Sequence, residues 1–168
     1  FYNQNPDGPV FPTPTIGMVG LLENMNMKMT LDFKAEGDVI FLLGNVTDDL
    51  GSSQYLSSVL KVEYSPAPHF DLEDEFQLQK KVAALITAGL VRSVHDVSEG
   101  GLWVTLCESG FNRELGFSVN SAEGVRKDAW LFGEGQSRVV VSVSKDKLAA
   151  FKAALGDHPA TEIGVVTG

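Results

Sequence analysis

The sequence Ser93-Val-His-Asp-Val-Ser-Glu-Gly-Gly-Leu102 joins two apolar segments of different periodicity. Apolar residues alternate before it, which is typical of a strand, and recur at helical spacing after Gly100 and Gly101. Backbone N–H groups at a helix start favour anions, and glycine allows a phosphate or another backbone to come close. The stretch therefore predicts a strand, a polar turn that carries His95 and Asp96, and a helix. Two interpretations stay open: a turn that faces a ligand, or a turn that only closes the fold.

Length, composition and charge describe one acidic globular domain. The chain has 168 residues, 43% of them hydrophobic and 21% charged, which suits a single domain with a buried core. Its net charge of -9, with lysine and arginine scattered singly, argues against a surface for nucleic acid or for an anionic membrane. No apolar run approaches the ~20 residues that span a bilayer, and the amino terminus lacks a signal-peptide pattern. Cys107 is the single cysteine, so an intramolecular disulfide and a cysteine-rich zinc site are excluded, and a cytoplasmic location is expected.

The first thirty residues differ in composition from the rest. Residues 1–15 combine prolines with asparagines, which predicts a proline-rich arm; the alternative is a loop that presents Thr13 and Thr15 to a ligand. The run Ile16-Gly-Met-Val-Gly-Leu-Leu22 predicts a buried strand whose glycines allow close backbone approach. Because the chain starts at Phe1 within a polar loop, we expect it to be a fragment of a longer protein. Three alternating methionines indicate adaptable core packing or, alternatively, a groove for a partner: Met25, Met27 and Met29.

Apolar periodicity predicts the elements of one α+β domain. The clearest helix starts after the N-cap candidate Asp71 and ends near Gly89. Its predicted core-facing residues are Leu72, Phe76, Ala83, Ile86 and Leu90. Further helices are expected at residues 50–60, 101–108, 127–132 and 146–155, and further strands at 39–43, 115–119, 139–143 and 163–166. Together they predict a mixed central β-sheet with packed helices, in a single domain that spans residues 1–168.

Three motifs, in this order, resemble one enzyme family: Pro12-Thr-Pro-Thr-Ile-Gly-Met-Val-Gly20, the 93–102 stretch, and Leu131-Phe-Gly-Glu-Gly-Gln-Ser-Arg138. Together they look like the carboxy-terminal domain of phosphoribosylformylglycinamidine synthase, and the resemblance spans nearly the whole chain. It implies an α+β fold like that of the carboxy-terminal domain of aminoimidazole ribonucleotide synthetase, packed beside a separate domain. The chain departs from the family pattern at Gly135, where serine is usual.

The resemblance implies a reaction that uses ATP and magnesium. The formylglycinamide ribonucleotide amide becomes an amidine, with ammonia supplied by a glutaminase subunit or domain. Such phosphoryl-transfer chemistry depends on positioning and on neutralisation of charge. The family's catalytic histidine lies in amino-terminal domains that are absent here, so the fragment alone is expected to be inactive, and no catalytic residue is assigned to it.

By analogy within the family, a small set of residues is expected to face the site. His95, Glu134, Gln136 and Ser137 are expected to bind the nucleotide substrate, Asp96 to lie near magnesium, and Gly100 and Gly101 to form a phosphate-facing loop.

Two other functions stay open. The chain could belong to aminoimidazole ribonucleotide synthetase or another ATP-dependent relative, although the Thr-Pro-Thr-Ile-Gly and Glu-Gly-Gln-Ser-Arg strings favour the synthase. It could also be a non-catalytic assembly module, with Arg138 paired to an acid at the start of a strand. An apolar face that docks a neighbouring domain has the same sequence pattern as core, so the sequence does not separate these alternatives.

Overall fold

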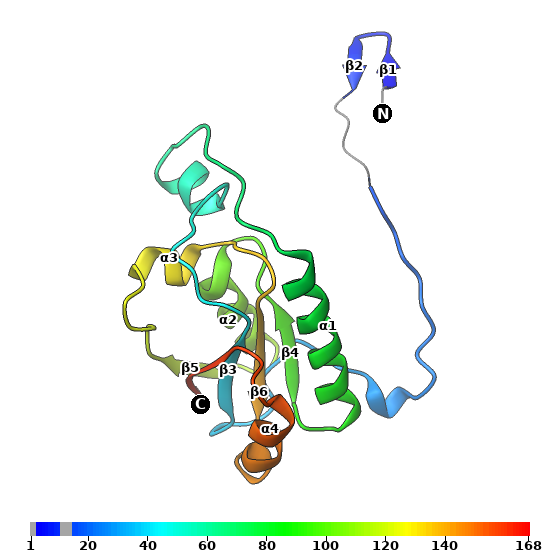
Figure 1. The fold of residues 1–168 in the computed structure, drawn as a ribbon, viewed down its shortest axis with the longest axis vertical. Helices are drawn as coiled ribbons and strands as arrows, with labels where there is room; N and C mark the ends of the chain where they lie inside the picture. The colour runs from blue at the N-terminus through cyan, green and yellow to red at the C-terminus, as the bar shows by residue number, and fades with distance from the viewer. Residues whose placement is uncertain (1–2, 11–14) are drawn as a thin grey trace.

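One antiparallel sheet organises the body of the molecule. The computed structural model describes residues 3–10 and 15–168, and Figure 1 shows their arrangement. The sheet has five strands in the order β4-β6-β3-β7-β5. These strands are β3 (Val39–Leu43), β4 (Ser93–Asp96), β5 (Gly116–Val119), β6 (Val139–Val143) and β7 (Ala160–Thr167). All of its pairings are antiparallel, so the α+β class is confirmed but the sheet is antiparallel where a mixed one was expected.

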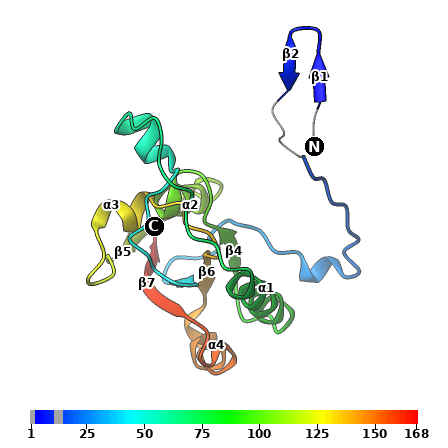
Figure 2. The ribbon, with the colours of Figure 1, turned by 45° about the horizontal axis from the view of Figure 1, so that its top comes forward.

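Helices cover both faces of the sheet. They are α1 (Leu72–Thr87), α2 (Gly101–Phe111), α3 (Lys127–Phe132) and α4 (Leu148–Leu155), with short turns at Met25–Met27, Tyr55–Val59 and Lys145–Lys147. Figures 1 and 2 place α2 and α3 on one side and α1 and α4 on the other. Because side chains alternate along a strand, Ile40 and Leu42 of β3 pack toward α2, and Phe41 and Leu43 pack toward α1 and α4. The unbroken apolar run of β3 is therefore buried throughout, as its sequence predicts.

The N-cap of α1 is as expected, its C-cap is Ala88 where Gly89 was predicted, and its buried face differs in part. Asp71 accepts hydrogen bonds from the N–H groups of Glu73 at 2.9 Å and Asp74 at 3.0 Å, as an N-cap does. The buried residues are Leu78 and Leu85, with Val82, Ile86 and Leu90 packed beside them. The predicted face was wrong at three of its five positions: Leu72 is 74% exposed, Phe76 is 52% exposed, and Ala83 is exposed as well. The helix carries two apolar stripes, and the sheet covers only one of them.

The described amino-terminal residues do not join the body. Strands β1 (Asn3–Asn5) and β2 (Gly8–Val10) form a hairpin of their own. The predicted buried strand at residues 16–22 was wrong for this structure, since the segment has no strand pairing and its apolar side chains are exposed. The methionines divide, because Met25 is exposed whereas Met29 packs against the core. Pro12, Thr13 and Pro14 of the first motif lie outside the described residues.

The remaining elements follow the sequence closely. α3 and β6 have the predicted bounds, and the expected helix at residues 50–60 is reduced to one π-helical turn, Tyr55–Val59. Within the described part of the chain, none of the helices combines the length and the apolar character needed to cross a bilayer.

Candidate functional site

Antiparallel pairing brings four loops to one end of the sheet. Leu43 pairs with Val139 and with Ala160, and Asp96 also pairs with Val139. The loops that follow β3 and β4 therefore lie beside the loops that precede β6 and β7. Asp96 and the loop before β6, which carries three further predicted site residues, meet at this end.

Two hollows, each of about 530 Å³, open among these loops. The first, called here the α4 hollow, lies between the loop after β3, α1 and the connection from α4 to β7. The second, called the β4 hollow, lies between α1, the loop after β4 and the loop before β6. Gln136 and Ser137 line both hollows, whereas Asp96 and Glu134 line only the β4 hollow.

Glu134 connects three segments through its carboxylate. Its Oε1 atom accepts a hydrogen bond from the Gln54 N–H at 2.7 Å and another from the Gly100 N–H at 2.9 Å. Hydrogen bonds to an ionised acceptor are stronger than neutral ones, so this contact fixes the loop before β6 against the start of α2. The carboxylate also occupies the position that a bound anion takes at a helix amino terminus.

Gly100 and Gly101 both have a positive φ and little room for a side chain. The Gly100 N–H donates to Glu134 and the Gly101 N–H donates to the Ser98 carbonyl at 3.0 Å, so both are already engaged, and displacement of Glu134 would free only that of Gly100. A Cβ at Gly101, where φ is +68°, would lie 2.7 Å from the Gly133 carbonyl oxygen and 2.8 Å from that of Leu131. The close approach that Gly101 permits is therefore that of another backbone, at the end of α3, whereas a Cβ at Gly100 would meet the Val104 side chain. The phosphate-facing role of both glycines stays a prediction.

His95 and Asp96 point to opposite faces of the sheet, as consecutive strand residues must. His95 is buried against α2: its Nδ1 lies 3.2 Å from both the Thr105 carbonyl oxygen and Ser109 Oγ, and its Nε2 lies 3.4 Å from a carboxylate oxygen of Glu108. It lines neither the α4 hollow nor the β4 hollow. The two residues therefore do not share the β4 hollow, which only Asp96 lines, although both border an open pocket beside Thr30 and Ile86.

Asp96 is exposed and faces the β4 hollow. Among residues 3–10 and 15–168, its carboxylate has neither a hydrogen bond nor an ion pair. The same described residues contain no group of three or more histidine, cysteine, aspartate or glutamate side chains that could hold a metal ion. Asp96 is thus available as one ligand, but the residues that the structure describes do not supply a complete metal site.

Ser137 and Gln136 differ in how they are held. Ser137 has a φ of +58°, and its hydroxyl donates to a carboxylate oxygen of Glu75 on α1 at 2.7 Å. Its carbonyl oxygen would lie 2.0 Å from a Cβ at Gly44, so the loops before β6 and after β3 are in close contact. Gln136 is exposed at the mouth of both hollows, and its side chain has no partner within the described residues. Gln136 is therefore the member of this loop that is free to contact a ligand.

The buried Arg138 side chain holds the same loop through hydrogen bonds to its backbone. It is 4% exposed and donates through Nε to the Gly135 carbonyl at 2.9 Å and through Nη2 to the Gly133 carbonyl at 2.6 Å. Burial lowers the pKa of the Arg138 guanidinium, and the Asp49 carboxylate partly opposes that shift. Instead of forming an ion pair with an acid, Arg138 stabilises the curved backbone of its own loop.

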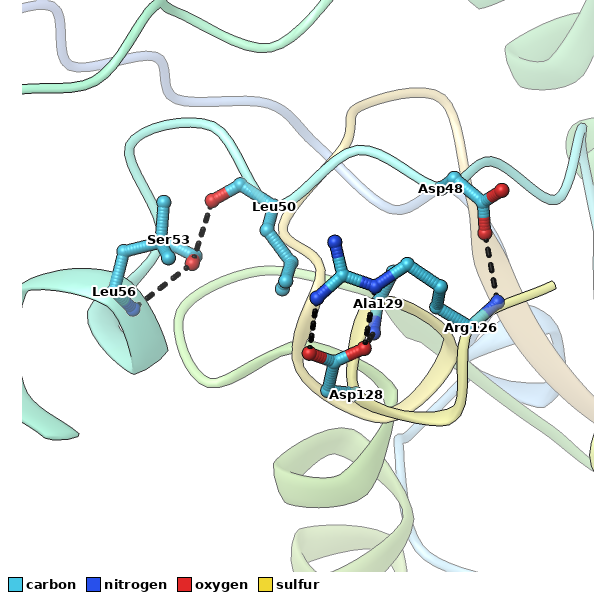
Figure 3. Close-up of polar contacts among 7 residues, drawn as sticks. All are labelled: Asp48, Leu50, Ser53, Leu56, Arg126, Asp128 and Ala129. Carbon is cyan, nitrogen blue, oxygen red and sulfur yellow. Dashed lines mark hydrogen bonds and ion pairs between the residues drawn. The ribbon is translucent and has the colours of Figure 1, made fainter. Parts of the chain in front are cut away.

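Two neighbouring aspartates, not singled out from the sequence, hold the loop after β3. Asp49 accepts hydrogen bonds from the Gly51 N–H at 2.7 Å and the His69 N–H at 3.0 Å. Asp48 accepts from the Arg126 N–H at 2.8 Å, next to the ion pair of Arg126 with Asp128 that Figure 3 shows. In the same view, the Ser53 hydroxyl donates to the Leu50 carbonyl and closes the next turn.

Comparison with known proteins decides the family. The sequence model described as "AIR synthase related protein, C-terminal domain" matches residues 35–168. The chain belongs to this family. Relatives of the chain include phosphoribosylformylglycinamidine synthase subunit PurL of Thermoanaerobacter sp. (strain X514), 38% identical over 169 residues, and PurL of Salinibacter ruber, 44% identical over 175 residues. Each alignment covers 99% of this chain and 23% of the relative, so the chain spans about a quarter of the length of these proteins.

Solved structures show the same fold. Thermotoga maritima PurL complexed with FGAR has a TM-score of 0.71 at 20% identity, covering 85% of this chain and 26% of that one. The same protein complexed with ATP has a TM-score of 0.68 at 19% identity, with 85% and 24% covered. These family matches confirm the resemblance predicted from the three motifs. The roles of individual side chains stay predictions.

Proposed function

We propose that this chain is the carboxy-terminal domain of a phosphoribosylformylglycinamidine synthase, and that it forms one wall of a cleft for the substrates of that enzyme. Support comes from PurL relatives that are 38% and 44% identical over nearly the whole chain. The placement of the cleft rests on one observation: the loop before β6 borders both hollows, and its residues Gln136 and Ser137 line each of them.

The reaction proposed for the full-length enzyme is the ATP-dependent conversion of formylglycinamide ribonucleotide to formylglycinamidine ribonucleotide. Complexes of T. maritima PurL with FGAR and with ATP support this substrate pair. In this domain, Gln136 would orient a substrate group by hydrogen bonding, while Glu134, Ser137 and Arg138 hold the loop in shape. Such positioning is a large part of catalysis in phosphoryl transfer, because the protein contributes little covalent chemistry.

Magnesium would require ligands from outside this chain. Asp96 is the available carboxylate at the β4 hollow, and the described residues do not gather a second and third ligand around it. We therefore propose Asp96 as a single contributor, with the other ligands and the glutaminase-derived ammonia supplied by the rest of the enzyme. A cytoplasmic location belongs to the same proposal and is supported by the single cysteine, Cys107, which has no partner for an intramolecular disulfide.

A non-catalytic supporting role is the second candidate. It is favoured by the internal hydrogen bonds of Glu134 and Ser137, because these side chains are already engaged without a ligand. The two candidate functions differ at Gln136, whose side chain has no partner within the described structure. Substrate binding requires a contact from this side chain, whereas a supporting role does not.

Replacement of Gln136 in the full-length enzyme tests the proposal. Because a lost hydrogen bond to substrate is worth about 1 kcal/mol, Gln136→Ala should raise KM for the nucleotide substrate or for ATP about five- to tenfold, with an unchanged melting temperature. Asn120→Ala is the matched control, since Asn120 is also an exposed amide but lines neither hollow. Kinetic constants of Gln136→Ala equal to those of the control would favour the supporting role.

A further inference from the structure

The three most exposed large apolar side chains among the described residues lie on one short segment. Met18 is 93% exposed, Val19 is 102% exposed and Leu21 is 98% exposed, and Ile16 in the same segment is 83% exposed. These fractions are those of a side chain without neighbours. Figures 1 and 2 both show this segment leading away from the body of the molecule.

The composition of this segment is that of an inner strand. Ile16 and Met18 would point to one face of a strand, and Val19 and Leu21 to the other, so both faces are apolar. Strands with two apolar faces are buried on both sides, within a sheet that is covered by other layers. Flexible linkers, in contrast, are rich in polar residues and poor in large aliphatic ones.

The body of this chain does not provide the partner. The first backbone contacts with the body occur later, where the Thr30 carbonyl accepts from the Val94 N–H at 3.2 Å and the Phe33 N–H donates to the Ser109 carbonyl at 2.8 Å. Thr30 therefore already lies against the β4 edge of the sheet. Within the described residues, the backbone of residues 15–23 makes no hydrogen bond with the sheet.

The comparisons indicate what covers the segment. The family model begins at residue 35, whereas the PurL relatives align over 99% of this chain and are about four times longer. The residues before 35 therefore have counterparts in PurL that do not belong to the carboxy-terminal domain of the family model.

We propose that residues 15–22 form an inner strand of the sheet of the preceding domain in the full-length chain. The boundary between the two domains then lies between residues 23 and 34, and the β1–β2 hairpin is part of the preceding domain as well. This inference rests on family membership and on the greater length of the relatives, and not on the reaction proposed above.

Amide hydrogen exchange in the full-length protein tests this placement without any substitution. Backbone amides of residues 16–22 should exchange at least ~100-fold more slowly in the full-length protein than in this chain alone, because strand pairing protects them. Rapid exchange of these amides in both proteins would overturn the proposal.

The substitution Val19→Asp provides a second, independent readout. It should lower the melting temperature of the full-length protein by several degrees, since it would place a charge inside a covered sheet, and should leave that of this chain alone unchanged. An unchanged melting temperature in both contexts would contradict the proposal. A third outcome would also overturn the proposal. If this chain forms a dimer that Val19→Asp abolishes, and the amides of residues 16–22 are unprotected in the full-length protein, the segment pairs with a second copy of the chain and not with the preceding domain. Neither measurement depends on enzymatic activity, so failure of the proposed function leaves the test intact.

Discussion

Glu134 and Gln136, two residues apart in one loop, have opposite surroundings. The Glu134 carboxylate accepts two backbone N–H groups, from residues 80 and 34 positions away in the sequence. The Gln136 side chain extends to solvent beside both hollows. The motif alone does not distinguish the two residues, because the distinction depends on contacts between distant segments. The sequence therefore singled out the loop but did not identify which of its side chains are engaged.

The opposite orientations of His95 and Asp96 predict opposite mutant phenotypes. His95→Ala should reduce the free energy of unfolding of this chain by about 2–3 kcal/mol, because it removes buried packing and the ring's contacts with the Thr105 carbonyl and the Ser109 hydroxyl. Asp96→Asn should change that free energy by less than about 0.5 kcal/mol, since the carboxylate is exposed and unpaired. In the full-length enzyme, Asp96→Asn should reduce turnover roughly 100-fold if the charge positions magnesium or phosphate.

Denaturant titration of this chain and steady-state kinetics of the full-length enzyme measure the two effects. Glu99→Gln is the control for Asp96, since Glu99 lines the same hollow. A melting drop of several degrees for Asp96→Asn, with normal turnover per folded molecule, would contradict the assignment.

His158 predicts a pH dependence of stability. Burial and the nearby Lys81 lower the pKa of His158 below its ordinary value of 6.5, and Asp74 opposes them in part. Its Nε2 is buried without a hydrogen-bond partner within the described residues. Because the unfolded chain then binds a proton more readily than the folded chain, His158 should reduce stability as the pH falls below about 6.5, and have no such effect above it.

Urea titrations at pH 7.5 and 5.5 check this dependence. His158→Gln should lose less stability between these two pH values than the unsubstituted chain, while His69→Gln, at an exposed loop position, should behave like the unsubstituted chain. Equal losses for His158→Gln and the unsubstituted chain would show that His158 does not contribute.

At the scale of elements, the local sequence pattern was sufficient to predict a helix or strand where the rest of the domain buries its apolar residues. The bounds of β3 and β6 follow from runs that are wholly or mostly apolar, and α3 ends at the glycine that follows Phe132. Pattern was insufficient for residues 16–22, whose strand-like sequence has no partner in the body. It was also insufficient for α1, since a helix with two apolar stripes does not reveal which one faces the sheet.

The junction of α2 with α3 depends on Gly101. Gly101→Ala should destabilise this chain by about 1–2 kcal/mol for the positive φ and by about 1–3 kcal/mol more for the contact with the carbonyls at the end of α3. Gly124→Ala is the matched control, because Gly124 has a similar φ of +76° and no atom within 4 Å of the added Cβ. Similar losses for the two variants, measured by chemical denaturation, would show that the close backbone approach contributes nothing.

At the scale of the whole molecule, this chain is about a quarter of the length of its PurL relatives. Its hollows lie at one end of the sheet, and neighbouring exposed residues, among them Phe70, Leu72 and Phe76, are apolar. The sequence indicated the family through three motifs, but the described residues gather no group of three or more histidine, cysteine, aspartate or glutamate side chains that could hold a metal ion. The physical reason is that a cleft between domains is assembled from both of them, and one domain contains only its own half of the contacts.

Amidine formation by the full-length protein and by this chain alone, assayed side by side, tests the central claim most directly. Each protein is supplied with ATP, magnesium, ammonia and formylglycinamide ribonucleotide, and formylglycinamidine ribonucleotide is measured. We predict turnover by the full-length protein and none above background by this chain, because the chain supplies one wall of the cleft and an incomplete set of metal ligands. Turnover by this chain alone would contradict the account, and so would a folded full-length protein that shows no turnover.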